Sequence, residues 1–394
     1  MRPANELLRI GSAVLHGHNM EVDGPATAAK GEMKVFHCTN CEQLVFFEST
    51  QCVHCGHTLA YLPDLQIMGS LEPEQGGMWI ANASGVPHTY RLCENYTVHN
   101  VCNWAIPDFE TQTQCQSCRL TRIAPDLDRS GFKEAWYRLE VAKRRLVYTL
   151  QQLHCFVKSS TEDPRGVAFD FLADPENPDE TAAAPVQSGH SNGIITINIA
   201  EADDAERERR RLQLHEPYRT LLGHFRHESG HYYWNLLIKD SDSIDEFRRL
   251  FGDERPDYDQ ALQNYYNHGA PPNWQQEFVT AYSGAHPWED WAETWAHYLH
   301  IVDTLETAAA CGLTLHPVRL DEPSLRSSFD PMKPGTDFRH LIDRWFPLTY
   351  ILNNLNRGLG LLDGYPFVLS PRSIEKLSFV HSTVHAVSVE KQRV

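Results

Sequence analysis

The chain has 394 residues, 41% of them hydrophobic and 22% charged, which allows two or three domains with their own cores. Its net charge of −17 disfavours a nucleic-acid partner, because binding to a phosphate backbone requires a basic face. The sequence has neither the roughly 18 consecutive apolar residues of a membrane span nor a secretory signal, so we expect a cytoplasmic protein without a membrane partner.

The chain begins with a region that has no periodic apolar pattern. We expect residues 1–32 to be a disordered tail, and the sequence leaves open whether translation starts at Met1, Met20 or Met33. Residues 33–122 then combine cysteine, glycine and proline with short β-prone runs. This composition predicts a small β-rich module that is held by metal rather than by a large core.

Two CxxC pairs separated by ten residues form the first cysteine cluster, which consists of Cys38, Cys41, Cys52 and Cys55. Each CxxC turn points both sulfurs to one side, and two facing turns give the tetrahedral thiolate set that zinc favours. Four thiolates leave no open coordination position. We therefore predict a structural zinc site in a zinc ribbon.

The second cluster is less regular and consists of Cys93, Cys102, Cys115 and Cys118. Four cysteines within 26 residues again predict a structural zinc site; His88 and His99 are alternative ligands, although four thiolates suffice. In a reducing compartment such clusters favour metal ligation over disulfides. The isolated Cys155 and Cys311 are expected to be buried apolar side chains.

Zinc ribbons also bind nucleic acids or proteins, so the charge of this region matters. Residues 33–122 contain four Lys and Arg against eight Asp and Glu, a net charge of −4. The region lacks the basic footprint of a DNA- or RNA-binding module. Contact with a protein partner, or structural support of the rest of the chain, is the expected role.

From about residue 130 the pattern becomes mainly helical, which predicts a second domain over 130–394 and an α+β protein overall. We expect a loop over 159–192 and a strand over 193–200, where β-branched residues alternate. Helices are predicted over 131–156, 203–214, from Pro217 onward, and over 243–251, 257–267, 287–307, 337–356 and 371–386.

The helix after Pro217 contains the motif HExxH, formed by His227, Glu228 and His231. Two histidines four residues apart on a helix can bind one metal, and the adjacent glutamate can take a proton from an activated water. The metzincin class of zinc peptidases is excluded, because its motif requires Gly at position 234 and a third ligand His at position 237, where this chain has Trp234 and Leu237. A neighbouring histidine, His224, could approach the metal or bond elsewhere.

A later segment, AYSGAHPWEDWAETWAHY, contains Glu289 and Glu293 four residues apart. With HExxH it resembles the gluzincin pattern of the anthrax lethal factor catalytic domain and of small gluzincins. The resemblance implies that Glu289 is the third ligand of a catalytic zinc and that Glu293 braces a zinc-bound histidine. It also implies that Tyr282, seven residues before Glu289, stabilises the oxyanion of the tetrahedral intermediate.

The whole chain from about residue 33 resembles a bacterial family of zinc-binding metallopeptidases, in which a cysteine-rich ribbon precedes a zincin-like domain. This implies a peptidase that acts on a peptide or protein substrate and holds one catalytic and two structural zinc ions. In zincins an edge strand pairs with the substrate, and Gly193–Ala200 is the candidate. The alternatives are a catalytically inactive zincin-fold scaffold and a zinc-ribbon interaction module.

Overall fold

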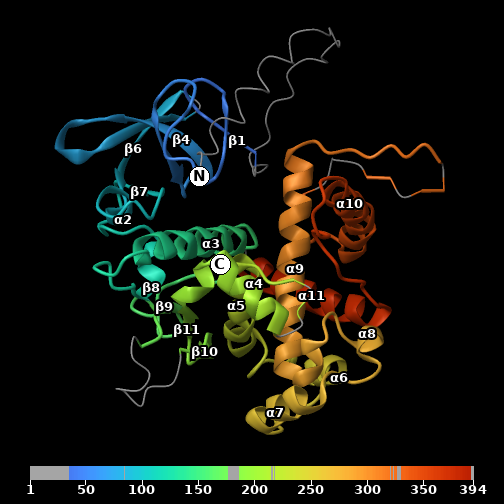
Figure 1. Ribbon diagram of the computed structural model, residues 1–394. Helices are drawn as coiled ribbons and strands as arrows, with labels where there is room; N and C mark the ends of the chain where they lie inside the picture. The colour runs from blue at the N-terminus through green and yellow to red at the C-terminus, as the bar shows by residue number, and fades with distance from the viewer. Residues whose placement is uncertain are drawn as a thin grey trace.

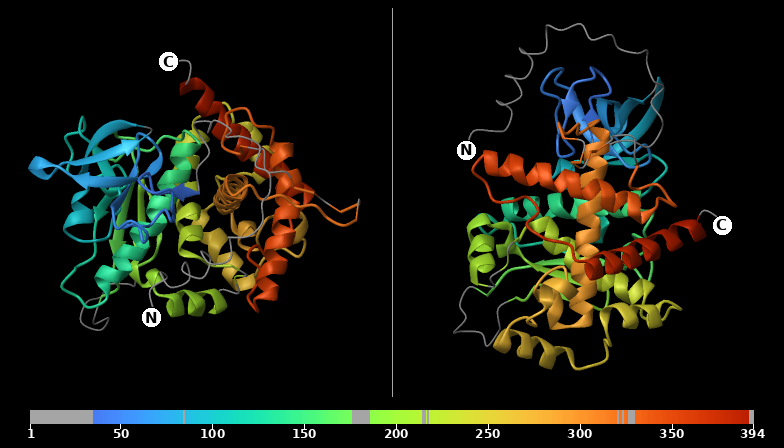
Figure 2. Two further views of the ribbon diagram at one scale, coloured as in Figure 1. Left: turned by 90° about the horizontal axis from the view of Figure 1, so that it is seen from above. Right: turned by 90° about the vertical axis from the view of Figure 1, so that its right-hand side faces the viewer.

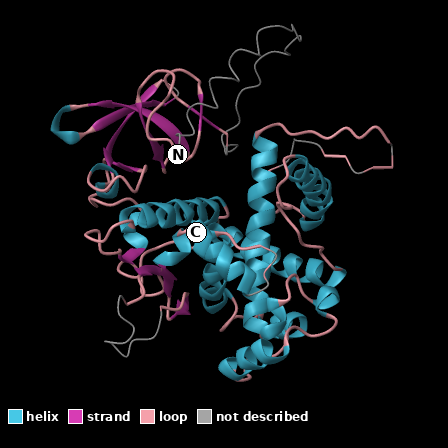
Figure 3. Ribbon diagram, viewed as in Figure 1, coloured by secondary structure: helices cyan, strands magenta, loops and turns pink. Residues whose placement is uncertain are grey.

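The computed structural model describes residues 35–391 except 84, 176–185, 214, 215, 217, 320, 323 and 326–329. The predicted tail, 1–32, therefore lies outside the described residues, as does Pro217. The described chain has a β-rich part at the N-terminal end and a mainly helical remainder (Figures 1 and 3). This confirms the predicted α+β class and its order along the chain.

The N-terminal part contains a five-stranded antiparallel sheet in the order β3-β4-β5-β6-β7, beside a short hairpin of β1 and β2. Its large aromatic residues are buried where this part meets helix α3 (Phe132–Gln152), whose Tyr148 packs edge-on against Phe36, Phe47 and Tyr61. The strands are β1 (Phe36–His37), β2 (Leu44–Val45), β3 (Thr58–Leu62), β4 (Ile67–Pro73), β5 (Trp79–Ala83), β6 (Val86–Leu92) and β7 (Ala105–Pro107), with helix α2 (Glu94–Thr97) after β6.

A second sheet has the order β10-β11-β9-β8 and lies beside α3 and α5 (Leu221–Leu237) (Figure 1). Its strands are β8 (Thr121–Ile123), β9 (Ala168–Leu172), β10 (Gly189–Ser191) and β11 (Ile194–Asn198). The strand predicted over 193–200 is present as β11, but it is not an edge strand, because β10 and β9 pair with its two sides. The edge on that side is β10.

The loop predicted over 159–192 is partly wrong, since it contains β9 and β10. In β9, four of five residues are buried, and the strand pairs in parallel with β8 and β11. A strand buried on both faces has no apolar–polar alternation, so periodicity alone does not reveal it.

The helical part is built around the long helix α9 (Pro287–Ala310), which packs against α5 (Leu221–Leu237) and is crossed by α10 (Phe338–Gly358) and α11 (Pro371–Lys391) (Figure 2). The predicted helices are confirmed within a few residues, except that the HExxH helix begins at Leu221. The remaining helices are α4 (Asp204–Gln213), α6 (Ile244–Phe251), α7 (Tyr258–His268) and α8 (Trp274–Glu277), with 3-10 turns η4 (Ile199–Ala202) and η5 (Tyr282–Ala285).

Candidate active site

The two cysteine clusters are each assembled as the spacing predicts, with all four sulfurs of a cluster within 4.8 Å of one another. The Sγ atoms of Cys38 and Cys55 lie 3.6 Å apart, and those of Cys102 and Cys115 lie 3.7 Å apart. The sulfurs of a tetrahedral site with 2.3 Å zinc–sulfur bonds are separated by about 3.8 Å. Both clusters therefore fit zinc, and neither includes His88 or His99.

At the most deeply buried sulfurs of each cluster, burial opposes ionisation unless a cation lies beside them. Burial raises the pKa of the Cys38 thiol to about 12, although nearby backbone N–H groups oppose the shift. The pKa of Cys115 is likewise raised by burial and by its cysteine neighbours. Ionised sulfurs in these positions need a positive charge beside them, which a bound zinc supplies.

Helix α5 carries the HExxH residues. Its N-terminus is capped by Thr220, whose side chain accepts a hydrogen bond from the Gly223 N–H at 3.0 Å. Four residues make about one helical turn, so His227 and His231 project from the same face, and their Nε2 atoms lie 3.3 Å apart.

Helix α9 brings Glu289 and Glu293 to this face. The helix starts at Pro287, and His286 caps it by accepting a hydrogen bond from the Trp288 N–H at 3.1 Å. Glu289 Oε2 lies 3.1 Å from His227 Nε2, and Glu289 Oε1 lies 3.5 Å from His231 Nε2. The ligand atoms of His227, His231 and Glu289 all fall within 4.8 Å of one another, a third group of the kind that can hold a metal.

Glu293 contacts the opposite side of the His227 ring, where its Oε1 lies 2.6 Å from Nδ1. A carboxylate only accepts hydrogen bonds, so this contact keeps the proton on Nδ1 and leaves Nε2 free for a metal. Burial opposes a charge on His227, but the nearby carboxylates of Glu289 and Glu293 outweigh it and raise the pKa of the ring. Without a metal, the excess of carboxylates attracts a proton to the site.

Glu228 is buried beside the three candidate ligands. Its Oε1 lies 3.2 Å from His224 Nε2, whereas its Oε2 has no hydrogen-bond partner among the described residues. Burial alone would raise the pKa of Glu228, but the contact with His224 and the charges of His227 and His231 lower it. An ionised carboxylate with one unpartnered oxygen can act as a base.

Two tyrosines border the site. The Tyr282 ring lies 6.1 Å from the His227 ring, in the turn just before α9. Tyr258, the first residue of α7, donates a hydrogen bond from its hydroxyl to Glu289 Oε1. The sequence patterns did not point to Tyr258, which lies 31 residues before Glu289 with no motif joining the two.

Other residues around the site have ordinary packing roles. Trp291 and Trp295 are buried and donate hydrogen bonds to Gly230 O and Ser229 Oγ of α5. Trp288 lies against the His231 ring at 5.1 Å. His297 is buried and shares a 2.6 Å hydrogen bond with the Tyr365 hydroxyl.

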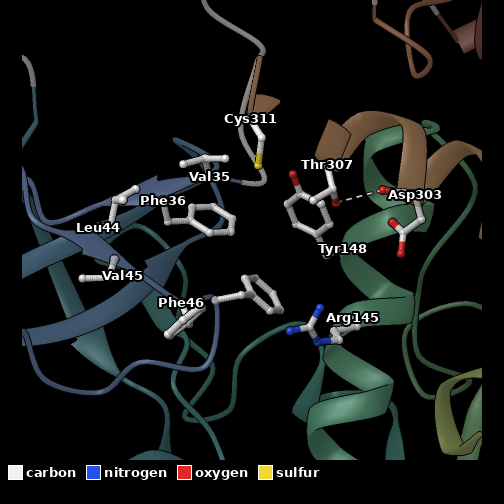
Figure 4. Close-up of a pocket in the computed structure, with 11 residues that line it drawn as sticks. Val35, Phe36, Leu44, Val45, Phe46, Arg145, Tyr148, Asp303, Thr307 and Cys311 are labelled. Atoms are coloured by element: carbon white, nitrogen blue, oxygen red, sulfur yellow. Dashed lines mark hydrogen bonds between the residues drawn. The ribbon is translucent and has the colours of Figure 1, made fainter. Parts of the chain in front are cut away.

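A cavity of about 410 Å³ lies between the N-terminal part and the helices (Figure 4), and none of the HExxH residues lines it. Asp303 on its wall is fourteen residues beyond Glu289 on α9, roughly 20 Å along the helix axis. Cys311 also lines this cavity and is exposed, so the prediction that it is buried was wrong, because α9 ends one residue before it. A protein contact through the ribbon remains a prediction.

Comparison with known proteins agrees with this two-part organisation. A family model described as "Putative zinc-binding metallo-peptidase" matches residues 132–383, and a zinc-ribbon domain model matches residues 35–129. Relatives from Mycobacterium tuberculosis and Mycobacterium bovis, described as uncharacterized proteins, are 42% identical over 359 residues, which is 90% of this chain and 96% of theirs. No solved structure matches. Among the described residues, none of the helices is long and apolar enough to cross a membrane.

Proposed function

The chain belongs to the family of zinc-binding metallopeptidases, and we propose that it is a zinc-dependent peptidase that hydrolyses peptide bonds in a peptide or protein substrate. The proposed ligands of the catalytic zinc are His227, His231 and Glu289, a gluzincin arrangement. Glu228 is the proposed general base, and Tyr282 the proposed donor to the oxyanion.

One observation carries this proposal, namely the convergence of three ligand atoms that lack other partners. Glu289 Oε2 is buried, has no hydrogen-bond partner among the described residues, and faces His227 Nε2 at 3.1 Å. A buried carboxylate oxygen without a partner is costly unless a cation neutralises it. Two imidazoles and a carboxylate are a ligand set of catalytic zinc sites, which keep one position open.

When bound, zinc supplies Lewis-acid polarisation of a water molecule and of the scissile carbonyl. Glu228 accepts a proton from that water through Oε2 and can then transfer it to the leaving amine. The Tyr282 hydroxyl donates to the carbonyl oxygen as negative charge develops there. Glu293 holds the His227 tautomer, and Tyr258 holds the second oxygen of Glu289.

The edge strand β10 is the proposed binding place for an extended substrate. It pairs with β11 on one side, and α5 packs against it. A peptide added to its other side, which pairs with no strand among the described residues, would run beside the HExxH helix. We further propose two structural zinc ions on the cysteine clusters and a reducing, cytoplasmic location, in which thiolates persist without oxidation.

The test is to incubate zinc-loaded protein with a proteome-derived peptide library and to identify new termini by mass spectrometry. The control is Glu228→Gln, loaded with zinc to the same measured content. We expect cleavage by wild type and almost none by the variant. If zinc-loaded wild type cleaves nothing, the peptidase proposal is wrong and the inactive zincin-fold scaffold becomes the better interpretation.

A further inference from the structure

His224 lies one helical turn before Glu228 on α5 and faces it rather than the candidate metal ligands. Its Nε2 is 3.2 Å from Glu228 Oε1, and the two side chains are only 14% and 7% exposed. His224 does not belong to the group of ligand atoms formed by His227, His231 and Glu289. His224 therefore contacts the proposed general base, Glu228, and does not contribute a metal ligand.

The opposite side of the His224 ring faces another buried carboxylate. Nδ1 lies 3.8 Å from Oε2 of Glu201, a residue of η4 that is only 1% exposed. Glu201 is held by two guanidinium groups, with Arg219 Nη2 at 2.8 Å and Arg210 Nη1 at 3.0 Å from its Oε1. The ring thus lies between the anchored carboxylate of Glu201 and the carboxylate of Glu228.

This arrangement determines which oxygen of Glu228 is available. A carboxylate can only accept hydrogen bonds, so the proton of the contact belongs to Nε2 of His224 and Oε1 is its acceptor. Oε2 is left without a partner among the described residues. A carboxylate held by one oxygen cannot rotate freely about its terminal bond, and a base works only within hydrogen-bonding reach of the proton it takes.

We propose that His224 is a positioning residue for the general base: it binds Oε1 of Glu228 and thereby directs Oε2 toward the water that is to be deprotonated. The proposal rests on the proposed role of Glu228. It assigns His224 neither metal binding nor contact with the substrate. Its loss should therefore lower kcat while leaving KM and zinc content unchanged.

The test compares His224→Leu, which cannot donate a hydrogen bond, with His224→Gln, whose amide can donate to Glu228. With a cleaved library peptide, we expect kcat to fall about 10–100-fold in the leucine variant and to recover in large part in the glutamine variant. His316→Leu, a change at an exposed histidine outside the site, is the matched control. Unchanged kcat in His224→Leu, or loss of zinc from it, would overturn the proposal.

A second measurement does not depend on activity or on the folding of the leucine variant. In protein with ¹⁵N-labelled histidine, the signal of the His224 Nε2 proton is assigned by its absence in His224→Gln. We expect this proton to be shielded from exchange in wild type and to exchange with water in Glu228→Ala. An identical signal in the two proteins would show that the contact is absent. This result would overturn the proposal whether or not wild type cleaves peptides, whereas a wild type that cleaves nothing but retains the contact would count against peptidase function alone.

Discussion

Gly230 of α5 lies directly against Ala292 of α9. A Cβ atom placed on Gly230 would be 2.8 Å from the Ala292 Cα and 3.3 Å from its Cβ. The carbonyl of Gly230 also accepts a 2.9 Å hydrogen bond from the Trp291 indole. Gly230 stands inside HExxH and Ala292 between Glu289 and Glu293, so this close approach of the two helices coincides with the candidate site.

Gly230→Ala should therefore disturb both folding and metal binding. The added methyl group must push backbone apart, since the nearest atom is a Cα rather than a flexible side-chain end, and overpacking of this kind costs about 1–3 kcal/mol. We expect a lower melting temperature and faster zinc loss to a chelator. The control is Gly358→Ala, at a helical glycine with open space around it, which should not lower stability. Unchanged zinc retention in Gly230→Ala would show that the close approach does not set the ligand geometry.

Glu289 and Glu293 share a helical face but should differ in effect when truncated. Glu289→Ala removes a proposed ligand and should lose one zinc almost completely. Glu293→Ala removes only the partner of His227 Nδ1 and should weaken zinc retention about 10–100-fold. Zinc content measured across a chelator series distinguishes the two. If Glu293→Ala lost the zinc and Glu289→Ala retained it, the third ligand would be Glu293, one helical turn beyond Glu289.

Tyr258 and Tyr282 should also differ in effect when each loses its hydroxyl group. Tyr258→Phe removes the hydrogen bond to Glu289 Oε1 and should reduce zinc retention about 10–100-fold. Tyr282→Phe should retain zinc fully and lose rate, because an oxyanion donor contributes about 3–4 kcal/mol to the transition state only. Zinc titration and peptide cleavage are measured on both variants. Equal zinc loss in the two would contradict separate roles.

The two cysteine clusters and the HExxH site together predict about three zinc ions per chain, two on thiolates and one on His227, His231 and Glu289. Elemental analysis of protein purified without chelator gives the count, and at most one zinc would contradict the ribbon sites.

Cys41→Ser should damage folding, since structural zinc binding is part of the folding free energy of a small module. Glu228→Gln should fold normally and serves as the control in circular dichroism and proteolysis.

His297 should make the protein less stable in mild acid. Burial lowers the pKa of His297 to about 4, and the charge of Glu293 opposes the shift only in part. Between this value and the unfolded pKa of about 6.5, the unfolded chain binds the proton and the folded chain does not, so stability falls as pH falls.

From pH 7 to pH 5, this one group should lower the free energy of unfolding by about 2 kcal/mol. His297→Asn, which retains an acceptor for the Tyr365 hydroxyl but does not titrate, should show a smaller loss over the same range. Urea unfolding at the two pH values measures the difference. Equal losses in the two proteins would mean that His297 does not contribute.

Short-range chemistry made much of this protein predictable. A helical turn of about 3.6 residues places positions i and i+4 on one face, so spacing alone orients the pairs His227–His231 and Glu289–Glu293. CxxC turns likewise define which sulfurs face one another, and the helices of the second half followed from their apolar periodicity. In each case the physical constraint acts within a few residues of the chain.

The tertiary structure decided the features that depend on which elements pack together. It placed Tyr258 on Glu289, put His224 between Glu228 and Glu201, and made β10 rather than β11 the edge strand. Apart from the His224–Glu228 contact within α5, these contacts have no sequence motif, because their partners come from separate elements whose approach is set by side-chain packing. The contact of Gly230 with Ala292 has the same origin. The sequence does not show that position 230 requires a glycine, because this requirement arises only where a second helix packs against it.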